Sequence, residues 1–253
     1  MEKKPSLIMS PIHDPSGKLH AALFRDLLGA QTTYFPNAVD NAVNNIRLAA
    51  CKLDGAVLLP SESLSWNQTI GQRTPEAGYL AAGAFADSGV VQEVGGGICQ
   101  VSTTLYWAVI LANLETVERT NHDFRVGYVP IGFDAAVSWP EPDFIFRNNR
   151  NYPVKIHAYT DAMDRCITVE IWGTDENGTR VVLRNDGEHT IYDSKYTATA
   201  IGTSTTTFRE IHDAAGKLLK TVRERYSEYK EYPEDIEWPP EKLAANAAAA
   251  HEG

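Results

Sequence analysis

The chain has 253 residues, 43% hydrophobic and 22% charged, which is enough for one well-packed domain with an extension or for two small domains. Its formal net charge of −10 argues against nucleic-acid binding, which calls for clustered Lys and Arg, and against docking on an anionic membrane surface. Three cysteines leave at least one free thiol, and no Cys/His pattern has zinc spacing, so we expect no metal and no organic cofactor.

The two ends of the chain differ in composition from its middle. Residues 1–30 form a charged preface in which no signal peptide or membrane-spanning segment is visible, and a short helix is expected at 19–28. Residues 231–253 are rich in acidic residues, proline and alanine and are expected to form a tail without stable structure. The domain prediction is therefore a main domain at 31–173 followed by a β-rich extension at 174–230.

Two helices are expected in the main domain. The first covers 37–53, where apolar residues recur with helical spacing, with Asn37 as its cap and Gly55 as its end. The second covers 98–113 and is apolar on so much of its surface that we expect it to be buried. Such a helix would hold Cys99 rigidly at its N-terminus.

The remainder of the chain predicts β-structure. A short strand is expected at 56–59, and the Gly- and Ala-rich segment 71–94 is expected to form an irregular wall. Hydrophobic alternation with a period of two predicts strands at 124–129, 144–147, 154–159, 166–172, 180–184, 205–211 and 218–226. Asn177-Gly178 is typical of a hairpin turn. The expected fold class is α+β: two main helices packed on an antiparallel sheet, with a C-terminal β extension.

The most informative segment is Gly95-Gly96-Gly97-Ile98-Cys99, in which three glycines lead into the second helix. A helix N-terminus lowers the pKa of a thiol through its dipole and free amide groups, so Cys99 is suited to act as a nucleophile. The glycines leave backbone amides accessible to an oxyanion or to a substrate backbone. The alternative for Cys99 is a buried, inert thiol, the interpretation that we favour for Cys51 and Cys166.

A thiol nucleophile needs a nearby imidazole to move protons, and His122 is the best of the seven histidines, since it follows the second helix closely. Asp134 is the candidate to orient that imidazole or to read a substrate amine; alternatively it is a turn residue beside Gly132. Asp123 is adjacent to His122 in sequence, so we expect its side chain to point elsewhere.

The string GGGICQVSTTLY at 95–106 resembles the signature of the VanW family, and further matches extend from about Thr32 to Gly173. The upstream matches are Asn45-Ile46, Ala49-Ala50, Leu53-Asp54-Gly55, the segment 59–67, Gly71-Gln72-Arg73-Thr74 and Gly78-Tyr79. The downstream matches are Val117-Glu118-Arg119, His122, 126–130, Gly132, Asp134-Ala135, 146–149 and Gly173. The chain departs from the family pattern at 63–67 and at Asp123, and neither departure involves Cys99.

The resemblance implies a cell-envelope protein with peptidoglycan L,D-transpeptidase or L,D-carboxypeptidase activity and stem peptides as its partners. Under this interpretation Cys99, His122 and Asp134 are the catalytic candidates. The candidates for contact with substrate or oxyanion are Gly95, Gly96, Gly97, Ser102, Arg73 and Arg119. The two arginines could bind a stem-peptide carboxylate or lie on the surface, and Ser102 could contact substrate or pack inside the protein.

The main alternative is a non-catalytic envelope module that binds stem peptide or a partner protein, with Cys99 buried. A cysteine peptidase acting on another amide also fits the Cys–His pair. The sequence leaves the oligomeric state open, and without a visible leader a cytoplasmic location also remains open.

Overall fold

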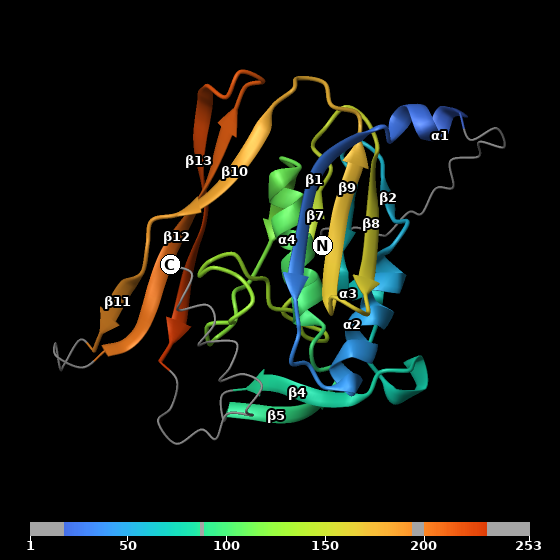
Figure 1. Cartoon of the computed structure of the whole chain (residues 1–253). Coiled ribbons are helices and arrows are strands. Elements are labelled where there is room, and N and C mark those ends of the chain that lie inside the picture. Colours follow the sequence, from blue (N-terminus) through green and yellow to red (C-terminus); the bar gives the residue numbers. More distant parts are fainter. Residues whose placement is uncertain (1–17, 87–88, 194–199, 232–253) are drawn as a thin grey trace, which may run out of the picture.

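The computed structural model describes residues 18–86, 89–193 and 200–231, which form four helices and thirteen strands (Figure 1). The helices are α1 (Lys18–Leu23), α2 (Asp40–Leu53), α3 (Trp66–Ile70) and α4 (Cys99–Leu111), with a short 3-10 turn at Pro75–Ala77. All strand pairings between these elements are antiparallel, and the α+β class is confirmed. Most of the predicted preface and tail, 1–17 and 232–253, lies outside the described residues.

The strands fall into four sheets. The first has the order β1 (Asp26–Tyr34), β9 (Cys166–Gly173), β8 (Val154–Asp161), β2 (Val57–Leu58). The second contains β10 (Arg180–Asn185), β12 (Ala200–His212), β11 (His189–Tyr192) and β13 (Leu218–Lys230). A three-stranded sheet has the order β3 (Ser63–Ser65), β7 (Ile145–Arg147), β6 (Glu115–Glu118), and β4 (Ala81–Ala86) pairs with β5 (Gly89–Val94).

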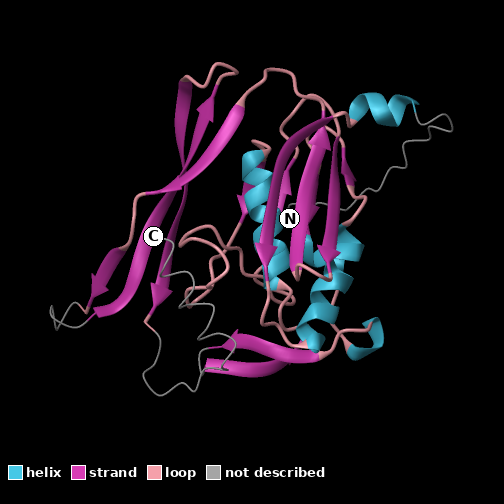
Figure 2. Ribbon diagram, in the orientation of Figure 1, coloured by secondary structure: helices cyan, strands magenta, loops and turns pink. Residues whose placement is uncertain are grey.

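Helices α2 and α4 cover one face of the first sheet, as Figure 2 shows. Strand β8 alternates between buried and more exposed residues, so its apolar side chains Val154, Ile156 and Ala158 face the helices. The predicted helix around 98–113 is confirmed as α4, and ten of its thirteen residues are buried. The core therefore forms between these two helices and the sheet, and Cys99 lies at the end of its most buried helix.

Strand β1 lies unusually close to α4 because it carries a glycine at the contact. A Cβ atom on Gly29 would lie 2.5 Å from the Ala112 nitrogen and 2.6 Å from the Ala108 carbonyl oxygen. Such distances leave no room for a side chain, and the contacting atoms belong to backbone that cannot rotate away. Close packing of the sheet on α4 therefore depends on Gly29.

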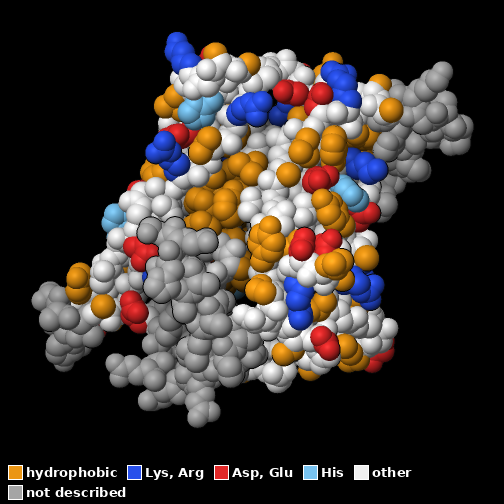
Figure 3. Space-filling model, in the orientation of Figure 1, with side chains coloured by type: hydrophobic (Ala, Val, Ile, Leu, Met, Phe, Trp, Pro, Cys, Tyr) orange, Lys and Arg blue, Asp and Glu red, His pale blue; other side chains and the backbone are white. Residues whose placement is uncertain are grey.

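The second sheet is the C-terminal extension. Strands β12 and β13 form a long hairpin whose pairing runs from Gly202↔Lys230 to His212↔Leu218, so the predicted strands at 205–211 and 218–226 are confirmed and are longer than expected. In Figure 3 hydrophobic side chains gather on the face between this sheet and the first one. Trp107 of α4 and Val181 of β10 are partly buried and pack against the main core, so the extension and the main domain share packed surface.

Several predictions were wrong, and each has a tertiary cause. The helix expected at 19–28 ends at Leu23, because residues 26–34 pair with β9 as an edge strand. The irregular wall at 71–94 contains the β4–β5 hairpin. Residues 124–129 form a loop, since their apolar side chains face the core or a cleft without strand partners.

Three smaller corrections concern single residues. Helix α2 begins at Asp40 with Val39 at the cap position, so Asn37 is not its cap. Cys51 is exposed on α2, whereas Cys166 is buried as expected. The Asn177-Gly178 turn joins β9 to β10, which pair in different sheets, and it therefore makes a crossover and no hairpin.

We expect Gly29→Ala to lower the free energy of unfolding by about 1–3 kcal/mol, because the new methyl group must push β1 away from α4. Urea unfolding followed by circular dichroism measures this difference. Gly55→Ala is the matched control, since Gly55 has φ +81° but nothing within 4 Å of the added Cβ, and its cost is that of backbone strain alone, about 1–2 kcal/mol. If Gly29→Ala unfolds with the same m-value and at the same midpoint urea concentration as wild type, the packing argument is contradicted.

Candidate active site

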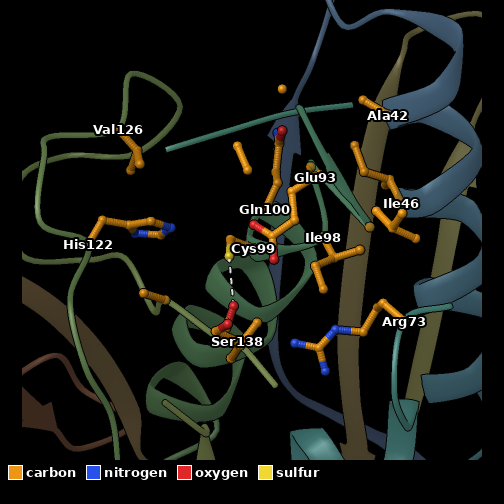
Figure 4. A pocket seen from close by; sticks show the side chains of 18 of the residues that line it. Ala42, Ile46, Arg73, Glu93, Ile98, Cys99, Gln100, His122, Val126 and Ser138 are labelled. Carbon is orange, nitrogen blue, oxygen red and sulfur yellow. Dashed lines mark hydrogen bonds between the residues drawn. The ribbon is translucent and has the colours of Figure 1, made fainter. Parts of the chain in front are cut away.

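A cleft of about 970 Å³ opens at the N-terminus of α4. One wall comes from α2, residues 72–73 and the β4–β5 hairpin, and the other comes from the loops at 120–128 and 136–142. In Figure 4 Cys99 lies between His122 on one side and Arg73 on the other. The cleft therefore gathers residues from five separate parts of the chain around one thiol.

Each glycine of the run 95–97 permits a close approach. A Cβ on Gly95 would lie 2.9 Å from the Arg73 Cβ, and one on Gly96 would lie 2.4 Å from the Ala82 carbonyl oxygen. Gly97 has φ +98° and sits against Ala42 of α2. The glycines thus bring Arg73, the β4–β5 hairpin and α2 up to the start of α4.

Asn45 of α2 holds this glycine run in place through hydrogen bonds. It is fully buried on α2, and its Nδ2 donates to the carbonyl oxygens of Leu80 (2.8 Å) and Gly96 (3.0 Å). Its Oδ1 accepts from the Leu80 amide at 2.8 Å. A polar residue on the core-facing side of α2 is therefore explained by the turn that it holds.

The backbone before Cys99 offers free donors. The amides of Ile98 and Gln100 donate to the carbonyls of Gly95 and Gly97. Within the described part of the chain, the amides of Gly97 and Cys99 make no hydrogen bond. Both residues are partly exposed and line the cleft. Two unpaired amides beside a thiol are suited to receive an oxyanion.

His122 lies in the loop after β6 and is 8% exposed. Its backbone amide donates to Asp134 Oδ2 at 2.7 Å, and its Nδ1 is 2.6 Å from the same oxygen. Because a carboxylate only accepts, Nδ1 carries the proton and Nε2 is left for the cleft and Cys99. The arrangement resembles the nucleophile–imidazole–carboxylate order of acyl-transfer enzymes.

The Asp134 side chain accepts four hydrogen bonds from described residues. Its Oδ1 accepts from Arg119 Nη2 at 3.0 Å and from the Tyr229 hydroxyl, while His122 occupies Oδ2. The side chains of Asp134 and Arg119 are each 1% exposed. Arg119 also donates to the Asp134 carbonyl at 2.6 Å and to Ser227 Oγ at 2.7 Å. Asp134 is therefore an ionised carboxylate, and both of its oxygens accept hydrogen bonds.

These contacts set the charges at the site. Burial alone would raise the pKa of Asp134, but the hydrogen bond with His122 and the charge of Arg119 hold it far below its ordinary value. Burial would lower the pKa of His122, but Asp134 and Cys99 raise it well above its ordinary value. Burial would raise the pKa of Cys99, but the hydrogen bond and charge of His122, with Arg73, lower it.

Both shifts act in one direction, because they favour the thiolate–imidazolium form of the Cys99–His122 pair over the neutral form. When Cys99 is protonated, its thiol donates to the Val137 carbonyl oxygen at 3.4 Å, so the other loop of the cleft holds the sulfur in place. A lowered thiol pKa in a partly accessible cleft is the condition for a reactive cysteine.

A family model described as VanW like protein matches residues 41–172, which contain Cys99, His122, Asp134 and most of the residues that line the cleft. The chain belongs to the VanW family. It is 43% identical over 141 residues to the uncharacterized protein YoaR of Bacillus subtilis (strain 168), a match covering 56% of this chain. It is 27% identical over 127 residues, 48% of this chain, to the vancomycin B-type resistance protein VanW of Enterococcus faecalis (strain ATCC 700802 / V583).

Each match spans 46% of the relative's own length. No solved structure matches this VanW-family chain significantly. No helix in the described residues is long and apolar enough to cross a membrane.

The structure of this VanW domain brings most of the predicted site residues together. Cys99, His122 and the run 95–97 line the cleft, as does Arg73, and Asp134 lies directly behind His122. Ser102 is fully buried and donates to the Ala135 carbonyl at 2.7 Å. Arg119 is buried against Asp134. Ser102 and Arg119 therefore do not line the cleft but support it from inside the protein.

Three residues that contribute to the site were not predicted from the sequence: Tyr128, Asn67 and Tyr229. Tyr128 lines the cleft, and its pKa is raised by burial and by the charge of Cys99, so it remains a donor. Asn67 holds Arg73, and Tyr229 reaches Asp134 from β13, outside residues 41–172. The adjacent Asp123 also lines the cleft, and its side chain pairs with Lys230. Tyr128 and Asn67 had a possible signal in the sequence, because both stand in segments that match the family, 126–130 and 59–67, whereas Tyr229 had none.

We expect Asp134→Asn to lower the free energy of unfolding by about 3–5 kcal/mol at pH 7, because it leaves the buried guanidinium of Arg119 without a countercharge. Asp123→Asn is the control, and the loss of its exposed pair with Lys230 should change stability by less than about 1 kcal/mol.

The stability difference between wild type and Asp134→Asn also has a predicted pH dependence. The depressed pKa of Asp134 means that its contribution is complete above about pH 4 and is lost as the pH falls toward the folded-state pKa. Urea titrations at pH 7 and pH 3 should show the two proteins converging in acid. A constant gap at both values would show that the charge of Asp134 is not what stabilises the fold.

We expect iodoacetamide to modify Cys99 readily at pH 6 in a Cys51→Ser background, because His122 lowers the pKa of the thiol. His122→Ala should slow the reaction at pH 6 at least about tenfold and move its pH dependence upward. Peptide mass spectrometry follows modification at Cys99 against time. His157→Ala, on β8 outside the cleft, should react like the parent; an unchanged rate in His122→Ala would refute the thiolate–imidazolium pair.

Proposed function

We propose that this VanW-family chain is a cysteine acyltransferase acting on peptidoglycan stem peptides, an L,D-transpeptidase that can also act as an L,D-carboxypeptidase. The observation that carries the proposal is the line from Cys99 through His122 to Asp134 in a cleft large enough for a peptide. The name of the Enterococcus relative, a vancomycin B-type resistance protein, supports a substrate in the cell wall. It also supports a location in the cell envelope.

The first half-reaction forms a thioester. The Cys99 thiolate attacks the carbonyl carbon of the third stem residue, and the carbonyl electrons move to oxygen, where the amides of Gly97 and Cys99 stabilise the oxyanion. The oxyanion then collapses and the C–N bond to the terminal D-alanine breaks. The departing nitrogen takes the proton from His122 Nε2, and D-alanine leaves as a neutral amine.

The second half-reaction returns the enzyme to its resting state. A side-chain amine of a neighbouring stem attacks the thioester while the now neutral His122 takes its proton. The C–S bond breaks, the Cys99 thiolate is restored, and the product is a 3–3 crosslink. Water in place of the amine gives a shortened stem peptide instead. Asp134 keeps the imidazole oriented throughout, and no metal or organic cofactor takes part.

Purified tetrapeptide muropeptides incubated with the protein and analysed by mass spectrometry test this function. We expect wild type to release D-alanine, with or without a new dimer, and Cys99→Ala to lower the rate by at least about a thousandfold. Cys51→Ser should retain the wild-type rate, because that thiol lies outside the cleft.

A folded wild type that releases no D-alanine and alkylates slowly at Cys99 would contradict the proposal. That result would favour a non-catalytic envelope module that binds stem peptide or a partner protein.

A further inference from the structure

Arg73 lies in the wall of the cleft, and its hydrogen-bond partners among the described residues are neutral. Its Nη1 donates to Asn67 Oδ1 at 2.8 Å and to the Gly71 carbonyl at 3.3 Å. Burial lowers the pKa of this guanidinium and the charges of Cys99, Glu93 and Asp143 raise it, but among the described residues no carboxylate forms an ion pair with it. A half-buried guanidinium has lost part of its hydration, and two neutral oxygens do not replace an anion. The side chain is therefore charged and prepared for an anionic ligand.

Asn67 holds the guanidinium in place. Its Nδ2 donates to the carbonyl oxygens of Ser138 (2.7 Å), Pro140 (3.0 Å) and Pro142 (3.2 Å). Three acceptors on one side fix the orientation of the amide, so Oδ1 must face Arg73. Through Asn67, Arg73 is linked to the loop at 136–142, which forms the opposite wall of the cleft. The position of the guanidinium is therefore fixed at its own end and not only through the aliphatic part of the side chain.

The position of Arg73 relative to His122 decides which part of a substrate it meets. Figure 4 shows the two side chains on opposite sides of Cys99. Arg73 and Cys99 influence each other by charge, so the guanidinium is near the reacting sulfur. His122 must protonate the leaving amine, which places the leaving amino acid on the His122 side. The side with Arg73 then receives the acyl half of the peptide.

We propose that Arg73 binds a carboxylate on the acyl half of the donor peptide, the half that stays on Cys99 as the thioester, and not the carboxylate of the leaving amino acid. This inference rests on the proposed function. Stem peptides carry such groups on the α-carbon of the γ-linked D-glutamate and, where the third residue is diaminopimelate, on its side chain. Amidation of these groups removes the charge, so Arg73 makes the site selective for non-amidated donors.

The test uses Cys99→Ala protein, which cannot consume the peptide. The probe is a tetrapeptide with diaminopimelate at position three, prepared in three forms: all acids, acyl-half carboxyls amidated, and only the terminal D-alanine amidated. Calorimetry should show the second form binding at least about tenfold more weakly than the first and the third, which bind alike. Adding Arg73→Ala should abolish this difference, whereas adding Arg147→Ala, an exposed arginine paired with Glu115, should preserve it.

The outcomes separate this inference from the proposed function. Three results overturn the carboxylate subsite. The first is weaker binding of the peptide whose terminal D-alanine is amidated; the second is a difference between the peptide forms that persists in Arg73→Ala. The third is that none of the three peptides binds. Turnover by wild type without any preference among the three forms keeps the acyltransferase and overturns the role of Arg73. Selective binding without turnover keeps the subsite for an anionic peptide and overturns the acyltransferase.

Discussion

The site depends on one buried carboxylate. Asp134 receives Arg119 and Tyr229 on one oxygen and two donors from His122 on the other, at a position with 1% exposure. A carboxylate without these partners would carry a desolvation cost of several kcal/mol, so it can exist there only when every partner is in place. The backbone amide and the ring nitrogen of His122 bind the same oxygen, which fixes the position and the rotation of the imidazole together.

This constraint ties the C-terminal sheet to the chemistry. Tyr229 and Ser227 of β13 hold Asp134 and Arg119, although the family match ends at residue 172. The Tyr229 hydroxyl also accepts from the Gly132 amide at 2.9 Å and thereby shapes the loop that carries Asp134. The functional unit of this chain is therefore larger than the matched segment, because residues about a hundred positions downstream complete the surroundings of the imidazole.

The features that the sequence could predict are those encoded within a few neighbouring residues. Helical periodicity predicted α2 and α4, and the glycine run predicted that Cys99 stands at the N-terminus of α4, where the structure has a cleft. Contacts such as Tyr229 with Asp134 join residues 95 positions apart and have no local pattern. For the same reason the chemistry of an arginine was predictable but its surroundings were not: Arg119 lies buried behind the site, whereas Arg73 lines the cleft.

The interpretation of 124–129 shows how a correct pattern can predict the wrong element. Its apolar residues do have apolar or cleft surroundings: Val126 and Tyr128 line the cleft, and Val129 packs on the core. Alternation therefore reflects two different surroundings of a loop, where a strand would have had pairing partners on a sheet.

In the proposed acyl transfer, the distribution of charge around the thiol would treat the acyl half and the leaving half of a substrate differently. Before the reaction the Cys99 thiolate of that mechanism would lie between two cations, His122 and Arg73, whose charges both lower the pKa of the thiol. Formation of the thioester removes the negative charge, and departure of the amine with its proton removes the charge of His122. Of the three groups Cys99, His122 and Arg73, only Arg73 would then remain charged, so the acyl half would keep its ionic contact while the leaving amino acid would lose its electrostatic attraction. Release of the first product and retention of the second then follow from one proton transfer, and the neutral imidazole is left as the base for the incoming amine.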